Sequence, residues 1–121
     1  MKEIFRDTED PLFVVEGYFD AKSIDGVATF GNKLTPGQID LLKMSKRQKV
    51  LIPDTKGNID CGIADQFLNF GWSISLPELS GCKDVNEAII RFGKLYTIKQ
   101  ISDNIRSGEL AEMLLRAYCT K

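Results

Sequence analysis

Residues 12–20 of the chain read Leu-Phe-Val-Val-Glu-Gly-Tyr-Phe-Asp. Four apolar residues end at the carboxylate of Glu16, Gly17 follows, and a second carboxylate, Asp20, comes four residues after the first. Such a run is typical of a buried strand that ends at the start of a helix. Because open α/β sheets bind ligands at the carboxyl ends of their strands, this segment predicts acidic oxygens at a ligand-binding edge. That is the geometry of a metal site or of acid/base chemistry.

Three further apolar segments repeat the strand pattern along the chain. Residues 27–30, 50–53 and 72–76 form short runs bounded by Gly, Pro or Asp. Helices are expected between the strands, at residues 18–24, 35–44 and 60–70, and Thr35 and Pro36 suit the start of the second. Because strands that alternate with helices form parallel sheets, we expect an α/β fold with about four mainly parallel strands and helices on both faces.

The rest of the chain is predicted to be helical. After a loop at residues 77–83, Asp84 can cap a helix over residues 84–92, and Glu87 stands three residues later, at the capping-box position. Beyond it, apolar residues at helical spacing on either side of residues 107–108 predict two amphipathic helices. These are more typical of core or of a packing surface than of a cofactor site. No linker is evident, so residues 1–121 are expected to form one domain.

Composition limits the possible partners. The 121 residues include 16 basic and 17 acidic ones, so no long-range field recruits nucleic acid, and such a contact must be local, shared with another domain or metal-mediated. No apolar run approaches the about 20 residues of a membrane span. Three scattered cysteines, without histidine or a Cys-x-x-Cys pair, predict free thiols in a reducing cytoplasm.

The one compact basic run has two interpretations. At the end of the second expected helix and just after it stand Lys43, Lys46, Arg47 and Lys49. Cations at the end of a helix complement its dipole, so the run can be a solvated helix end. The alternative is a patch that contacts phosphates.

Four acids follow the expected strands and are predicted to converge. Glu16 ends the first strand, Asp20 lies one helical turn beyond it, Asp54 follows the third strand, and Asp84 follows the loop after the fourth. Read singly, each acid is a cap or a solvated loop residue. In a parallel sheet, however, these strand ends share one edge, and a cluster of carboxylates there holds a divalent cation or a shared proton. Oxygen ligands without His or Cys favour Mg²⁺ or Mn²⁺.

Four sequence blocks resemble a known family. Residues 14–20, 26–31, 50–54 and 81–87 match, in order and spacing, the toprim domain of topoisomerases, primases and some small nucleases. The first and last blocks look most like phage-type DNA primases, including the T-even type. The resemblance covers residues 10–92 and implies a compact, Rossmann-like toprim core, with residues 93–121 as a C-terminal helical extension. It implies Mg²⁺- or Mn²⁺-dependent phosphodiester chemistry.

The resemblance also implies roles for individual residues. Glu16 would be the general acid/base in nucleotidyl transfer, while Asp20 and the acids after the third strand would hold the metal. Asp84, with Asn86 or Glu87, would complete the acidic rim. Gly17 and Gly31 would allow the backbone to turn sharply after the first and second strands.

The loop after the third strand departs from the family pattern. Family members place a second aspartate two residues after Asp54, where this chain has Lys56. Either the loop is longer and Asp60 takes the missing ligand position, or Lys56 has replaced it and its ammonium occupies a phosphate or cation site. Lys56, Lys83 and Asn86 are accordingly the candidate phosphate-binding residues.

Three functions are consistent with these patterns. The first is the catalytic domain of a phage DNA primase that joins ribonucleoside triphosphates on a single-stranded DNA template. Because the zinc-binding module and the basic subdomain are missing, we expect a fragment or a separately expressed domain that needs the remaining primase domains and is a poor polymerase alone. The second is a small toprim nuclease. The third is a non-catalytic module whose tail helices dock a partner such as the replicative helicase.

Overall fold

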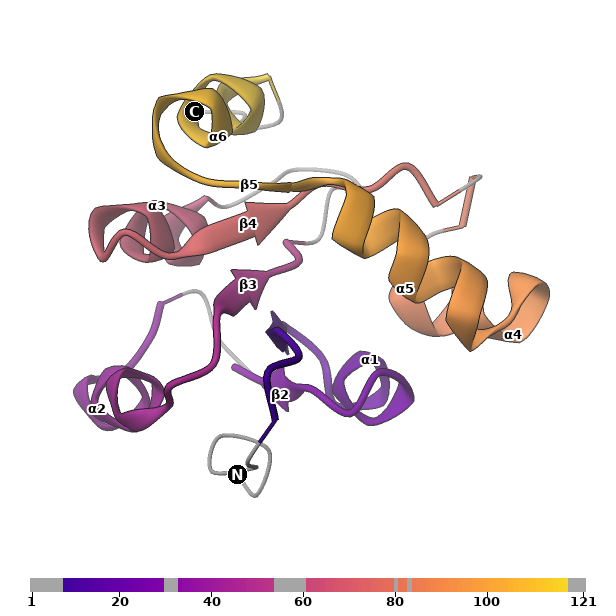
Figure 1. The fold of residues 1–121 in the computed structure, drawn as a ribbon, viewed down its shortest axis with the longest axis horizontal. Coiled ribbons are helices and arrows are strands. Elements are labelled where there is room, and N and C mark those ends of the chain that lie inside the picture. The colour runs from indigo at the N-terminus through magenta and orange to yellow at the C-terminus, as the bar shows by residue number, and fades with distance from the viewer. Residues whose placement is uncertain (1–7, 30–32, 54–60, 80, 83, 118–121) are drawn as a thin grey trace.

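A computed structural model describes residues 8–29, 33–53, 61–79, 81–82 and 84–117. It shows an α/β fold in which one mostly parallel sheet lies between helices. Five strands form one sheet in the order β2-β1-β3-β4-β5, in which β1 to β4 are parallel and β5 is antiparallel to β4 (Figure 1). The strands are β1 (Leu12–Val15), β2 (Val27–Ala28), β3 (Lys49–Leu51), β4 (Ser73–Ser75) and β5 (Ile105–Arg106).

Six helices complete the described fold and lie on both faces of the sheet (Figure 1). They are α1 (Tyr18–Ser23), α2 (Pro36–Met44), α3 (Gly62–Asn69), α4 (Val85–Phe92), α5 (Lys94–Asp103) and α6 (Gly108–Arg116). The predicted α/β class, the mainly parallel sheet and the two covered faces are therefore confirmed. This architecture is consistent with a Rossmann-like fold.

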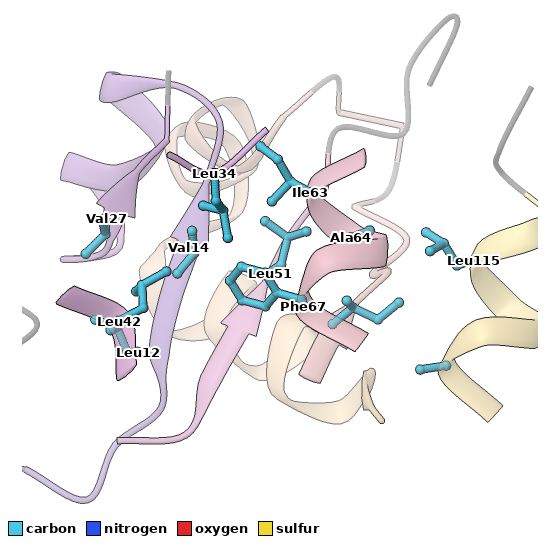
Figure 2. Packing of buried hydrophobic residues seen from close by; sticks show 12 residues of the cluster. Leu12, Val14, Val27, Leu34, Leu42, Leu51, Ile63, Ala64, Phe67 and Leu115 are labelled. Carbon is cyan, nitrogen blue, oxygen red and sulfur yellow. The ribbon is translucent and has the colours of Figure 1, made fainter. Parts of the chain in front are cut away.

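Alternating side chains of β1 divide the core in two. Leu12 and Val14 belong to a cluster with α2, α3 and α6, shown in Figure 2, where Leu51 and Phe67 lie at its centre. The intervening Phe13 and Val15 belong to a second cluster, with α1, α4 and α5. Because successive side chains of a strand point to opposite faces, a continuous apolar run in β1 is what a sheet covered on both sides requires.

The C-terminal segments are integral to both clusters. Ile101 of α5 is fully buried in the second cluster, and the buried hydroxyl of Ser75 donates a 2.7 Å hydrogen bond to its carbonyl oxygen. In the first cluster, Ala111 and Leu115 of α6 are buried. The prediction that the tail forms core or packing surface is confirmed.

The fifth strand corrects the sequence prediction. Ile105 was expected on a helix, but it pairs with Ser75, and Arg106 pairs with Ile74. Helix α5 ends just before, with Asn104 as its C-cap. Two residues are too few to show a strand period, so only the pairing with β4 identifies β5.

Local helix signals were predicted well. The Thr35 hydroxyl accepts a hydrogen bond from the Gln38 backbone N–H at 3.1 Å, and the Gln38 side chain accepts one from the Thr35 N–H at 2.9 Å. This capping box, followed by Pro36 at the first helical position, starts α2 as expected. At the other end of the domain, Gly71 follows α3 with φ of +76°, a conformation that favours glycine.

Three of the four residues of the basic run, Lys43, Arg47 and Lys49, make contacts within the protein. Arg47 is buried, and its guanidinium donates to the carbonyl oxygens of Asp10 at 2.9 Å and Pro11 at 2.8 Å. Lys49 donates to the Ser45 carbonyl oxygen, and its burial lowers the pKa of its ammonium group. The Lys43 ammonium lies 4.7 Å from the ring centroid of Phe70. Arg47 is thus buried and not part of the solvated helix end that the sequence predicted, and its contacts and that of Lys49 are structural.

Arg47 fastens the segment that leads into β1, so its loss should be costly. We expect Arg47→Met to lower the free energy of unfolding by about 1–3 kcal/mol, because two carbonyl oxygens lose a charged donor while the apolar stem is kept. Urea unfolding measures the change. Lys46→Met, at an exposed neighbouring position, is the matched control and should stay within about 0.5 kcal/mol of the wild type. Equal losses in the two variants would show that net charge, not these hydrogen bonds, is responsible.

The cysteine prediction is partly wrong. Cys82 is a buried free thiol, as expected, but Cys61 is disulfide-bonded, which sequence spacing could not reveal because disulfide pairing depends on proximity in space. Cys119 lies outside the described residues. Among the helices of the described part of the chain, none has the length and apolar character to cross a membrane.

Candidate functional site

The end of β1 delivers Glu16 and Asp20 to the carboxyl edge of the sheet. Glu16 is the first residue after the strand and is half-buried, and Gly17 is the N-cap of α1. The backbone at Gly17 is extended, with φ of −106°, so the turn does not require glycine for its left-handed freedom. A β-carbon there would lie 3.8 Å from Asp20 Oδ2, an ordinary contact distance. This carboxylate oxygen is therefore close to the end of β1.

Asp20 also connects α1 to α4, which is distant in sequence. Its Oδ1 accepts a hydrogen bond from the backbone N–H of Asn86 at 2.9 Å. The Ser23 hydroxyl donates to the side-chain oxygen of the same asparagine at 2.6 Å. Because both bonds join α1 to the first turn of α4, the position of Asp20 is fixed relative to the second acidic segment.

Asp84 begins that second segment as the N-cap of α4. Its Oδ1 accepts a hydrogen bond from the Glu87 backbone N–H at 2.8 Å, which confirms the predicted cap. The negative charges of Asp84 and Glu87 lie in the first turn, where they complement the helix dipole. Arg91, one turn later, forms a 3.8 Å ion pair with Glu87.

These residues surround a surface hollow of about 490 Å³, within the size range of small-molecule sites. It is lined by the beginnings of α1 and α4: Gly17, Tyr18, Phe19, Asp20, Asp84, Asn86, Glu87 and Ile90. Asp20, Asp84 and Asn86, which the sequence analysis selected, are thus brought together. Glu16 is not among the lining residues, although Gly17 follows it directly.

The remaining predicted site residues cannot be placed. Gly31, Lys83 and the whole loop with Asp54, Lys56 and Asp60 lie outside the described residues. Whether Asp60 or Lys56 takes the second ligand position therefore stays a prediction.

The donor chemistry of the described residues fits a hard cation in part. Carboxylate and amide oxygens suit Mg²⁺ or Mn²⁺, and Asp20 has one oxygen held by α4 while the other faces the end of β1. However, the described part of the chain contains no group of three or more His, Cys, Asp or Glu side chains arranged to hold a metal ion.

Thr29 is a polar residue of this edge that the sequence analysis missed. Its N–H donates to the Val15 carbonyl oxygen at 2.9 Å, so it sits beside the end of β1 where Glu16 begins. Its hydroxyl is buried and has no hydrogen-bond partner, unlike the other buried side-chain polar atoms of the described residues. The only signal in the sequence was a hydroxyl residue directly after the second strand. A buried hydroxyl without a protein partner can be satisfied by an ordered water or ion at this edge.

Two comparisons with known proteins identified no relative of this chain. No family model matches the chain, and a search of the curated proteins gave no match. A function must therefore be argued from the residues and from the hollow that they line.

Proposed function

We propose that this chain is a toprim-type catalytic domain of a DNA primase, which joins ribonucleotides on a single-stranded DNA template in a metal-dependent nucleotidyl transfer. The observation that carries the proposal is the meeting of Asp20 and Asp84, 64 positions apart in the sequence, around one hollow beside the end of β1. Both belong to blocks that resemble the toprim motifs. The parallel sheet brings both acids to the same edge, where a toprim-type site would need them.

Glu16 is assigned the proton transfer in this reaction. The 3′-hydroxyl of the growing primer loses its proton to the Glu16 carboxylate as its oxygen attacks the α-phosphorus, and pyrophosphate leaves. A general base in this role contributes about 10²–10⁴-fold to the rate. Glu16 suits the role because it stands at the exposed end of a rigid strand, half-buried and next to the hollow.

Asp20 is assigned to metal binding, with Asp54 and with either Asp60 or Lys56 after β3. When bound, Mg²⁺ or Mn²⁺ offsets the charge of the triphosphate. Asp84 holds α4 in place and completes the acidic rim, while Asn86, Lys83 and Lys56 are proposed phosphate contacts. In this proposal the remaining primase domains supply the template, and the replicative helicase is a further partner.

A primer-synthesis assay tests the proposal and separates it from the nuclease alternative. The chain is incubated with Mn²⁺, ribonucleoside triphosphates and labelled single-stranded DNA, alone and together with the template-binding part of a phage-type primase. We expect metal-dependent primers in the combined reaction and an intact DNA label in both. Cleavage of the DNA by the chain alone would favour the nuclease, and neither activity would favour a non-catalytic module.

A further inference from the structure

Two aromatic rings stand exposed at the rim of the acidic hollow. Tyr18 and Phe19 occupy the first turn of α1, directly between Gly17 and Asp20, and are 54% and 72% exposed. Their ring centroids are 5.5 Å apart with an interplanar angle of 72°. Across the hollow, Ile90 of α4 is 75% exposed. Neighbouring exposed apolar groups around a hollow mark a binding site more often than isolated surface residues do.

The acids of the hollow are already occupied within the protein. Asp20 accepts from the Asn86 N–H, Asp84 accepts from the Glu87 N–H, and Glu87 pairs with Arg91. Each carboxylate nevertheless keeps its negative charge, and a carboxylate can accept more than one hydrogen bond. The first turn of α4 also offsets part of the negative charge through its dipole. What the hollow offers besides charge is the flat apolar surface of two exposed aromatic rings, which suits the face of a planar ligand.

We infer that the hollow is a base-stacking subsite, in which an unpaired nucleobase stacks on the exposed face of Phe19 beside the acidic edge, with the Tyr18 ring packed at a steep angle against Phe19. This inference rests on the proposed function, which places nucleotides at that edge. Stacking of bases on aromatic side chains is tolerant of sequence because every base has a π-face. Ile90 adds an apolar side chain to the lining, and the carboxylate oxygens of the rim can accept hydrogen bonds from the amino groups of a base.

The subsite would orient the nucleotide relative to the acids, which the acids alone do not do. Phe19 and Asp20 line the same hollow, so a base held on the Phe19 ring lies beside the proposed metal ligand. Holding a reacting group near its catalytic partners converts a loose encounter into an oriented one. Tyr18 and Phe19 are thus positioning residues, and Asp20 and Glu16 remain the chemical ones.

Fluorescence anisotropy tests the subsite with two labelled probes, a short thymidine oligonucleotide and an abasic strand of equal length, in the presence of Mg²⁺. The wild type should bind the oligonucleotide more tightly than the abasic strand. Phe19→Leu keeps an apolar side chain but removes the π-face, and should weaken oligonucleotide binding by roughly 5- to 100-fold while leaving the abasic strand unaffected. Phe19→Trp should restore binding.

Phe92→Ala is the matched control, because Phe92 is also a partly exposed aromatic residue but does not line the hollow. It should leave both affinities unchanged. Competition with a ribonucleoside triphosphate identifies the source of the base: displacement assigns the subsite to the incoming nucleotide, and no displacement assigns it to the template, and either result supports stacking.

Equal affinity for the two probes, no binding of either, or an unchanged affinity in Phe19→Leu would overturn the inference, as would tighter binding of a lysine- and arginine-rich peptide. Measuring Mn²⁺ binding by the Phe19→Leu chain distinguishes a failure of the stacking subsite from a failure of the proposed metal-dependent function. If stacking fails while metal binding persists, only the subsite is wrong. If metal binding also fails in the wild type, the proposed function itself is contradicted.

Discussion

Removal of residues 107–121 is expected to abolish cooperative folding. The deletion takes away α6, whose Ala111 and Leu115 are buried against α3 and the sheet in the same cluster as Phe67 (Figure 2). Truncating a single buried leucine costs about 2–5 kcal/mol, and the whole stability of a domain is about 5–15 kcal/mol. Losing the helix also exposes the apolar surface of α3 that it covers. Circular dichroism during thermal unfolding should show a broad transition or none.

Two single substitutions show whether packing causes the effect. Leu115→Ala should lower the free energy of unfolding by about 2–5 kcal/mol. Met113→Ala, on the same helix but 71% exposed, should change it by no more than about 0.5 kcal/mol. A truncated chain that unfolds with the wild-type midpoint would show that α6 is an appendage, available to a partner such as the helicase.

Glu16→Gln is expected to reduce primer synthesis by about 10²–10⁴-fold without unfolding the protein. Glutamine keeps the size and one acceptor oxygen of the side chain but cannot accept the proton of the attacking hydroxyl. Single-turnover nucleotide addition, in the combined reaction with the template-binding part, measures the chemical step. Thermal unfolding should remain close to that of the wild type, which separates lost chemistry from lost structure.

The matched control for this variant is Glu109→Gln, which makes the same change at an exposed position on α6. It should leave nucleotide addition unchanged. Retention of the full rate in Glu16→Gln would remove Glu16 from the reaction and with it the assignment of the β1 edge as the catalytic one.

Features of the fold that depend on local sequence were predictable. The strands and most helices follow from apolar runs, and the caps Thr35 and Asp84 form bonds only three residues along the chain. What could not be read locally was β5, whose two residues are a strand only because β4 pairs with them. The disulfide of Cys61 was missed for the same reason, since it depends on proximity in space.

The candidate site was predictable in outline but not in detail. Reasoning from strand ends correctly brought Asp20 and Asp84 together, yet the link between them runs through the first turns of α1 and α4 and the Asn86 N–H. The exposure of Tyr18 and Phe19 was invisible in the sequence, because an aromatic residue at the start of a helix is equally compatible with the core. The unpaired hydroxyl of Thr29 was hidden likewise, since hydrogen-bond partners come from the whole fold.

Calorimetric titration of Mn²⁺ into the chain tests the central claim, that this acidic edge is a metal-dependent catalytic site. We expect saturable binding at millimolar or lower Mn²⁺, weakened at least tenfold in Asp20→Asn and Asp54→Asn. Asparagine at position 20 still offers an acceptor to the Asn86 N–H, so α4 stays in place while a charge is lost. Asp40→Asn, on the exposed side of α2, should bind as the wild type does. A folded wild-type chain with no saturable Mn²⁺ binding would contradict the account.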